Sequence, residues 1–363
     1  MINFELDQEQ KMLTDAIGRL AQERMRKVFR DADEEGALPP DVIKAGWEIG
    51  VLPTSIPEAY GGFGDYSVMT GVLAAEAFAW GDLAATLHVM TPNLVAVPLM
   101  LAGTEAQKEA HLPLFCEEGL PKVTAALTEP VIQFDPRKLK TTAVLENDAY
   151  ILNGTKCFVP LAEDAETFLI YANENGQTQA FFVPRDVAGL TVNGREKLMG
   201  IRALPTFQVK LDNVHISAVN KLGGSEGIDF SRILNHSRVA LGALAVGMAK
   251  GAFEYARDYA KERVQFGEPI AHRQSIAFML AEMAMDIDAA RLLVWEAAWQ
   301  LDQGKDATQS AAVMKYYVDD MVMTVCDRAL QTLGGYGYIR EYPVELWLRN
   351  ARAFASFDGM AIV

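Results

Sequence analysis

An acidic side chain near the end of the chain is the first candidate for chemistry. Asp358 stands between the aromatic Phe357 and the flexible Gly359. Burial beside apolar neighbours disfavours the charged form of a carboxyl group and raises its pKa, which suits a general base. The alternative is a solvated acid at the end of a helix. On spacing alone that alternative is the more common case, because charged side chains are mostly exposed.

Two further motifs could hold an anionic or planar ligand. Gly334, Gly335 and Gly337 follow an apolar helical pattern, and a turn without Cβ atoms lets the backbone approach a ligand closely. Arg263 begins an Arg-Val-Gln-Phe-Gly motif, and its guanidinium fork suits paired phosphate oxygens. Exposed arginines are common, so the arginine motif becomes a strong signal only together with the glycine turn downstream.

The elements that must position these residues fall into three zones. Residues 1–118 show helical spacing, and residues 119–225 contain short apolar or β-branched runs between Asn-Gly and Asn-Asp turns. Residues 226–363 return to long, alanine-rich amphipathic patterns. The sequence predicts an α+β multidomain fold: an N-terminal α-helical domain, a middle β-barrel or sandwich domain, and a C-terminal α domain like a four-helix bundle.

Composition limits the functions that need to be considered. The chain has 363 residues and a formal net charge of −15, which argues against nucleic acid as a partner. Its three cysteines and five histidines show no spacing typical of zinc sites. The start lacks the apolar core of a signal peptide, and no run of about 18 apolar residues free of charge predicts a membrane span. We expect a reducing, cytoplasmic setting.

The stretch from Gln331 onward resembles the C-terminal signature of the acyl-CoA dehydrogenases, a flavoprotein family. The residues that match are Gln331, Gly334, Gly335, Tyr336, Gly337, residues 340–343, Glu345 and Arg349. In the medium- and short-chain branch a catalytic glutamate follows, and here Asp358 occupies its position. Similar matches, among them the Leu-Thr-Glu-Pro stretch that begins at Leu127, extend the resemblance over nearly the whole chain.

The resemblance implies FAD as cofactor, an acyl-CoA substrate and Asp358 as the catalytic base. The residues it assigns to the cofactor are Leu127, Thr128, Phe158, Val159, Arg263, Phe266, Gln274, Gln331, Gly334 and Gly335. The residues it assigns to the substrate are Asn235, Ser237 and Arg238. Arg263 would clamp the flavin pyrophosphate of a neighbouring subunit, so a homotetramer or dimer, or a mixed oligomer with a homologous chain, is implied. The usual electron acceptor of the family is an electron-transferring flavoprotein.

Several positions depart from the family pattern. Residues 131–134 replace two glycines and a serine, and Pro160 replaces a residue whose hydroxyl would bond the flavin. The long-chain and isovaleryl branch keeps its base as a glutamate near Ser237, and no glutamate stands there in this chain. Asp358 is therefore the only candidate base that the family pattern offers.

The prediction from sequence is an FAD-dependent acyl-CoA dehydrogenase that introduces an α,β double bond into a thioester. The alternative is a family member that has lost dehydrogenation, as a flavin-poor subunit of a mixed complex or as an enzyme of different acyl-CoA chemistry. A hydrolase is a third class, because residues 223–227 fit Gly-x-Ser-x-Gly around Ser225. The strand that should lead directly into such a nucleophile turn is missing, so a glycine-rich loop before a helix is favoured.

Overall fold

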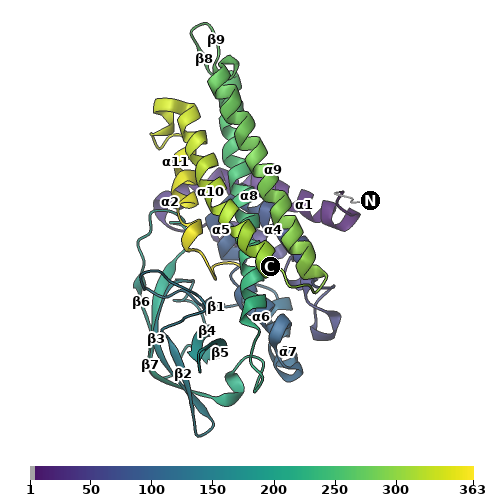
Figure 1. Cartoon of the computed structure of the whole chain (residues 1–363), viewed down its shortest axis with the longest axis vertical. Coiled ribbons are helices and arrows are strands. Elements are labelled where there is room, and N and C mark those ends of the chain that lie inside the picture. The colour runs from purple at the N-terminus through teal and green to yellow at the C-terminus, as the bar shows by residue number, and fades with distance from the viewer. Residues whose placement is uncertain (1–4) are drawn as a thin grey trace.

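The structure is a computed structural model that describes residues 5–363 (Figure 1). The predicted N-terminal domain starts at residue 1, so its first four residues lie outside the described residues. Its helical prediction is confirmed. The elements are α1 (Gln8–Leu20), a π-helical turn (Ala21–Met25), α2 (Arg26–Glu35), α3 (Pro40–Glu48), α4 (Val68–Gly81), α5 (Leu83–Val89), α6 (Asn93–Ala102) and α7 (Glu105–His111).

Helix starts in this domain follow from local side-chain chemistry. Thr104 caps α7: its side chain accepts a hydrogen bond from the Gln107 backbone N–H at 3.2 Å, and the Gln107 side chain accepts one from the Thr104 N–H at 3.1 Å. This reciprocal pair satisfies two backbone donors that have no partner inside the helix. Pro40 opens α3, where a missing N–H costs nothing.

The middle zone forms one curled sheet of seven strands. The strands are β1 (Val123–Ala126), β2 (Thr142–Glu146), β3 (Ala149–Pro160), β4 (Thr167–Glu174), β5 (Gln177–Pro184), β6 (Leu190–Arg195) and β7 (Thr206–Ser217). Their order is β1-β4-β2-β3-β7-β6, with β5 paired to β4. The β prediction is confirmed, although sequence reasoning missed β6, whose residues are mostly exposed and show no apolar run.

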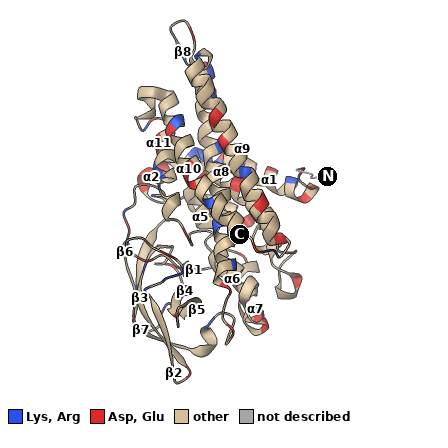
Figure 2. Cartoon of the chain, in the orientation of Figure 1, with Lys and Arg blue, Asp and Glu red and all other residues tan. Residues whose placement is uncertain are grey.

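The C-terminal zone consists of long helices that pack against each other and against α4. They are α8 (Phe230–Glu262), α9 (Gln274–Asp302) and α10 (Thr308–Leu333), followed by a 3-10 turn (Gly334–Gly337), α11 (Val344–Ala351) and a second 3-10 turn (Phe354–Ser356). A small hairpin of β8 (Val264–Gln265) and β9 (Glu268–Pro269) joins α8 to α9. In Figure 1 this hairpin and the β-sheet lie at opposite ends of the molecule. Figure 2 shows the charged residues mainly along the helices.

The gaps between these elements agree with the expected organisation. The last helical turn before the sheet ends at Cys116, and β1 begins at Val123. A short 3-10 turn (Ala218–Asn220) follows the sheet, and α8 begins at Phe230. We propose that the domains are 1–118, 119–225 and 226–363. Ser225 lies in the connecting turn and not at the end of a strand, as the loop interpretation requires.

Within residues 5–363, α8 is long and apolar enough to cross a membrane, and the bent pair α5 and α6 meets the same criterion together. The most apolar window of α8 is 78% buried inside the molecule. A core helix of a soluble protein meets this criterion as well, so the absence of a membrane span stays a prediction.

A cluster of charges ties α11 to α2. Arg349 pairs with Asp33 at 2.6 Å and with Glu345 at 2.7 Å, and it donates to the Met199 carbonyl at 2.8 Å. Arg30 on α2 also pairs with Glu345. Because several charges share these contacts, the cluster fixes geometry better than an isolated surface pair. It holds the helix that leads directly to Asp358.

Candidate active site

Asp358 lines a cavity of about 650 Å³ between the sheet and the end of the chain. Most of its walls come from three segments: the loop after β1, the irregular part of β3, and the turn that carries Asp358, while Glu196 after β6 and Gln208 on β7 complete them. The lining residues are Thr128, Glu129, Pro130, Val131, Ile132, Gln133, Phe134, Cys157, Phe158, Glu196, Gln208, Ala355, Ser356 and Asp358. Its size is within the range of ligand-binding cavities. Two of the predicted cofactor residues, Thr128 and Phe158, thus share a cavity with the predicted base.

Only one of the two oxygens of the Asp358 side chain has a partner among the described residues. Its Oδ2 lies 3.4 Å from Nη2 of Arg238, and the two side chains are 21% and 16% exposed. Its Oδ1 is buried and has no hydrogen-bond partner among residues 5–363. One oxygen of the carboxylate is therefore without a hydrogen bond among the described residues, while the other lies beside the Arg238 guanidinium. Asp358 is not the solvated acid that spacing alone favoured.

The backbone around Asp358 is anchored from two elements. Thr128, at the end of β1, donates its hydroxyl to the Asp358 carbonyl at 3.0 Å. Ser237, on α8, accepts the Gly359 N–H at 3.3 Å. Thr128 and Ser237 were assigned to cofactor and substrate by resemblance. In this structure their hydroxyls position the turn that carries the candidate base.

Gly359 makes the Asp358 turn possible. Its φ is +83°, and a Cβ there would lie 2.7 Å from Cδ2 of Leu127. Only glycine combines this backbone conformation with so close an approach. Leu127 itself faces a second, smaller cavity on the far side of the turn. The sequence signal Phe-Asp-Gly therefore reflects a packing constraint as well as chemistry.

Phe158 lies at an irregularity in the sheet. The pairing of β3 with β7 shifts register between Lys156 and Val159, and Phe158 has φ +54°. Such conformations are strained for a bulky residue and persist only where the surroundings hold them. Glu196 provides one support, since its Oε2 accepts the Phe158 N–H at 3.0 Å. Val159, which was also predicted to bind the cofactor, is fully buried in the sheet core and is not among the residues that line the cavity, because its side chain packs inside the sheet.

Two charged residues behind the Asp358 turn were missed by sequence reasoning. Lys315 on α10 donates to the Phe354 carbonyl at 3.0 Å and to Asp319 at 2.7 Å. Burial raises the pKa of Asp319, with the nearby Asp358 adding to the shift, while Lys315 and Arg238 oppose it. The only signal was a Lys and an Asp four residues apart on a largely apolar helix. This spacing is also typical of a surface ion pair.

A buried ion pair supports the loop after β1. Lys156 Nζ lies 2.9 Å from Oε1 of Glu129 and donates to the Leu127 carbonyl at 3.0 Å. The Glu129 carboxylate also accepts the backbone N–H groups of Lys140 at 2.7 Å and Thr141 at 2.8 Å. These contacts connect the core of the sheet to the residues that line both cavities.

A third cavity, of about 580 Å³, lies beside the β8–β9 hairpin. It brings together five of the residues predicted to bind FAD: Arg263, Phe266, Gln331, Gly334 and Gly335. Gln274 is not among its lining residues, and it lies exposed at the first position of α9.

Two arginines give this third cavity its positive charge. The Arg263 guanidinium lies over the Tyr336 ring at 5.1 Å, and Arg273 lies over the Phe266 ring at 5.7 Å. No atom lies within 4 Å of a Cβ built on Gly334 or Gly335, so their backbone is open to a ligand. The Gly334 N–H donates to the Gln331 carbonyl at the end of α10, so the two guanidinium groups are the donor set that suits a pyrophosphate.

Asn235 is the predicted substrate residue that the structure separates from the others. It is buried on α8, and its Nδ2 donates to the Thr308 hydroxyl at 3.0 Å. It lines none of the three cavities described above. Its role toward a substrate stays a prediction, as do the roles of the other site residues.

Comparison with known proteins decides the family. Three family models match consecutive parts of the chain: the acyl-CoA dehydrogenase N-terminal domain over residues 7–118, the middle domain over 124–214, and the C-terminal domain over 228–361. The chain belongs to the acyl-CoA dehydrogenase family. Its relatives are flavoprotein oxidoreductases that act on CH–CH bonds. The family and fold predicted from the sequence are confirmed.

Individual relatives cover almost the whole length of the chain. The probable acyl-CoA dehydrogenase YngJ of Bacillus subtilis is 35% identical over 99% of this chain and 96% of its own. The caffeyl-CoA reductase-Etf complex subunit CarC of Acetobacterium woodii is 35% identical over 93% of this chain and 90% of its own. The structure of butyryl-CoA dehydrogenase from Megasphaera elsdenii aligns with a TM-score of 0.90, at 32% identity, over 99% and 96% of the two chains.

Proposed function

We propose that this acyl-CoA dehydrogenase family member uses FAD to introduce an α,β double bond into an acyl-CoA thioester, with Asp358 as the base. The observation that carries the proposal is the position of the carboxylate. Asp358 faces a cavity of about 650 Å³, one of its oxygens is buried without a partner, and the other is paired with Arg238.

The residues present fit FAD. Phe158 would border the isoalloxazine ring in the cavity that contains Asp358. Arg263, Phe266 and the Gly334–Gly335 turn would hold the dinucleotide end. When bound, FAD supplies the two-electron acceptor of the reaction.

The protein's own residues would handle the proton. The Asp358 carboxylate would accept the proton from the carbon next to the thioester carbonyl. Arg238, 3.4 Å from Oδ2, would hold the carboxylate in its orientation. Thr128 and Ser237 fix the backbone on both sides of the carboxylate. Such anchoring matters because a displacement of about 1 Å can reduce a rate about 100-fold.

The site requires a second copy of the chain in this proposal. The cavity beside β8 and the cavity at Asp358 share no lining residue, and the β8–β9 hairpin projects at one end of the molecule (Figure 1), so the FAD that one chain holds by its ring would receive Arg263 from a partner. A stripe of exposed apolar residues recurs every seven positions on α9: Phe278, Met285, Leu292 and Trp299, which are 58%, 69%, 51% and 49% exposed. This spacing keeps the four on one helix face. We propose a dimer or tetramer that covers this face.

Met285→Glu combined with Leu292→Glu is expected to dissociate the oligomer, because charged residues are depleted from the cores of interfaces. We expect the mass measured by light scattering to fall to that of one chain, and the bound FAD per chain to fall with it. Val144→Glu is the matched control, since Val144 is 50% exposed and apolar but lies on β2. A double variant that keeps the wild-type mass would show that this face is not the interface.

The acceptor and the cellular location complete the proposal. CarC is named as a subunit of a complex with an electron-transferring flavoprotein, and we propose the same class of acceptor for this chain. We propose a cytoplasmic location, in keeping with three unpaired cysteines.

The visible spectrum of the purified protein tests the function. We expect a yellow protein with bound FAD, which loses its visible absorption when a saturated acyl-CoA is added without oxygen. Free CoA is the control, because it offers no acyl carbon to deprotonate. A protein that is colourless although folded and oligomeric, or one that no acyl-CoA bleaches, would contradict the proposal.

One feature of the site favours a second candidate, a family member that does not dehydrogenate. Pro160 has neither a hydroxyl nor an N–H to offer a flavin, and its carbonyl accepts the Thr124 hydroxyl at 2.6 Å. A flavin-poor subunit of a mixed complex would be colourless alone and would co-purify with a homologous chain. An enzyme of different acyl-CoA chemistry would turn over its substrate without bleaching.

A further inference from the structure

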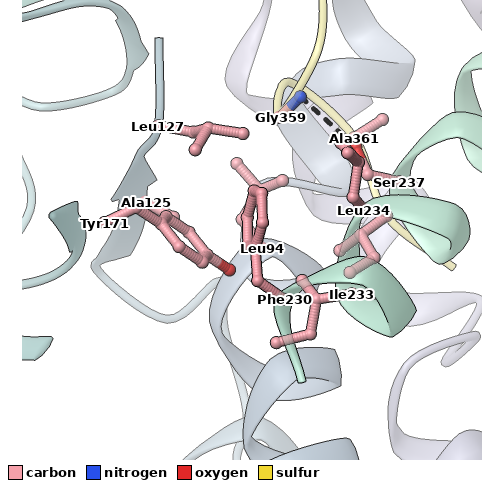
Figure 3. Close-up of a pocket in the computed structure, with 11 residues that line it drawn as sticks. Leu94, Ala125, Leu127, Tyr171, Phe230, Ile233, Leu234, Ser237, Gly359 and Ala361 are labelled. Atoms are coloured by element: carbon pink, nitrogen blue, oxygen red, sulfur yellow. Dashed lines mark hydrogen bonds between the residues drawn. The ribbon is translucent and has the colours of Figure 1, made fainter. Parts of the chain in front are cut away.

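A small cavity lies on the other side of the Asp358 turn. Gly359 and Leu127 border it (Figure 3). Asp358 itself borders the cavity of about 650 Å³. Its walls are almost entirely apolar: Leu94, Ala125, Leu127, Tyr171, Phe230, Ile233, Leu234, Ser237, Gly359, Ala361 and Ile362. Its free volume is about 20 Å³, which is room for roughly one water molecule.

The chain's own last residues fill this space. Ile362 is 2% exposed and belongs to the same apolar cluster as Leu94, Phe230 and Leu234. Its carbonyl accepts a hydrogen bond from Nδ2 of Asn93 on α6 at 3.3 Å. The Ile362 side chain therefore occupies a crevice whose other walls come from α6, α8 and the sheet.

The position of this crevice suits it to receive the hydrocarbon part of an acyl group. If the carbon next to the thioester carbonyl faces Asp358, the rest of the acyl chain must continue along the turn. An apolar crevice next to that turn is the environment that a hydrocarbon chain prefers. With Ile362 in place, the free volume is too small for more than the beginning of such a chain.

We propose that Ile362 sets the length of acyl group that the site accepts, by closing the apolar crevice beyond Asp358. This inference rests on the proposed function, because it takes an acyl thioester as the ligand. It assigns the chain to short acyl groups, which end before they reach Ile362. It also makes Ile362 a specificity-determining residue that contacts no reacting atom.

The tail is anchored at both ends, which argues against easy displacement of Ile362. Before it, Gly359 is bonded to Ser237, and Met360 donates its N–H to the Phe357 carbonyl at 2.8 Å. After it, the Val363 carbonyl lies 2.9 Å from Nδ1 of His236. Val363 also packs on α4 so closely that a Cβ built on Gly71 would lie 2.9 Å from Cβ of Val363.

Binding of S-alkyl-CoA thioethers tests the proposal without any dehydrogenation. Ethyl, butyl, hexyl and octyl thioethers are titrated into the FAD-loaded oligomer by calorimetry. For the wild type we expect affinity to stop rising beyond butyl. For Ile362→Ala we expect it to keep rising toward hexyl, because each further methylene that is buried tightens binding about fourfold, or about 0.8 kcal/mol. Two methylenes then give about a 15-fold difference.

Two further variants serve as controls for this experiment. Val363→Ala shortens the neighbouring tail residue, which does not line the crevice, so we expect it to keep the wild-type preference for short thioethers. Ile362→Val is the milder change if Ile362→Ala fails to fold, and we expect it to admit about one further methylene.

The outcomes separate this proposal from the proposed function. The gain in affinity from butyl to octyl thioether is compared between the wild type and Ile362→Ala. Equal gains in the two proteins would overturn the role of Ile362, even if butyryl-CoA bleaches the flavin. A length limit released by Ile362→Ala supports that role even if no acyl-CoA bleaches the flavin. Absence of binding by every thioether, to wild type and variants, would overturn it as well.

Discussion

Asp358→Asn is expected to slow acyl-CoA bleaching of the flavin by on the order of 1,000-fold while leaving the flavin bound. Asparagine has almost the same shape as aspartate and can keep an oxygen near Arg238, so the turn and both cavities should stay intact. Its amide cannot accept the proton that the Asp358 carboxylate would take. Anaerobic stopped-flow absorption measures the rate, and the spectrum before mixing measures the flavin content.

Asp358→Glu and Glu196→Gln are the informative companions of that variant. Glutamate keeps a carboxylate but moves it by about 1.5 Å, one carbon–carbon bond, so we expect a slower yet measurable rate. Glu196 lines the same cavity, and burial raises the pKa of its carboxyl, which makes it the rival base. If Asp358→Asn bleaches at the wild-type rate and Glu196→Gln does not, the base is Glu196.

Much of the fold could be predicted because the relevant signals are local. The α10 helix runs from Thr308 to Leu333, as its spacing of apolar residues indicates, and Thr104 starts α7 through chemistry within four residues. Strand β6 escaped prediction because most of its residues are exposed, so its place in the sheet depends on pairing with β7 and not on its own pattern.

The same distinction between local patterns and long-range contacts applies to the candidate site. Asp358, Arg263 and the Gly334–Gly335 turn could be found, since motif spacing carries the signal for them. The contacts of Asp358 with Thr128 and Arg238 join residues 230 and 120 positions apart in the sequence. The insertion of Ile362 beside Leu94 is of the same kind. Nothing in a local pattern specifies such contacts, because they depend on how three domains pack together.

Lys156→Met is expected to destabilise the protein by about 3–5 kcal/mol at neutral pH, because it leaves the Glu129 carboxylate buried without its cation. Both side chains of this pair are almost completely buried, at 0% and 2% exposure. The variant also lacks the hydrogen bond that the Lys156 ammonium donates to the Leu127 carbonyl. We therefore expect the loop after β1 to bind the flavin more weakly. Denaturant unfolding measures the stability, and flavin fluorescence measures the release of FAD.

The pH dependence distinguishes loss of the ion pair from a simple packing defect. In the wild type, burial opposes ionisation of Glu129, but Lys156 and the hydrogen bonds from Thr141 and Lys140 outweigh it and lower the Glu129 pKa. That stabilisation is present above the unfolded pKa of about 4.3 and is lost as the pH falls through the folded value. Burial lowers the pKa of Lys156 to about 8, against the effect of Glu129, so the lysine keeps its charge at pH 7.

Without Lys156 the pKa of Glu129 should shift in the opposite direction, upward on folding. A buried carboxyl group that has lost its cation holds its proton more tightly when folded, so the stability of Lys156→Met should rise as the pH falls toward 4. The difference from wild type should therefore shrink in acid, whereas a packing defect would give a difference independent of pH. Adding Glu129→Gln removes the titrating group, and we expect the double variant to lose this pH dependence. A constant difference between pH 4 and 7 would mean that the pair contributes by packing and not by charge.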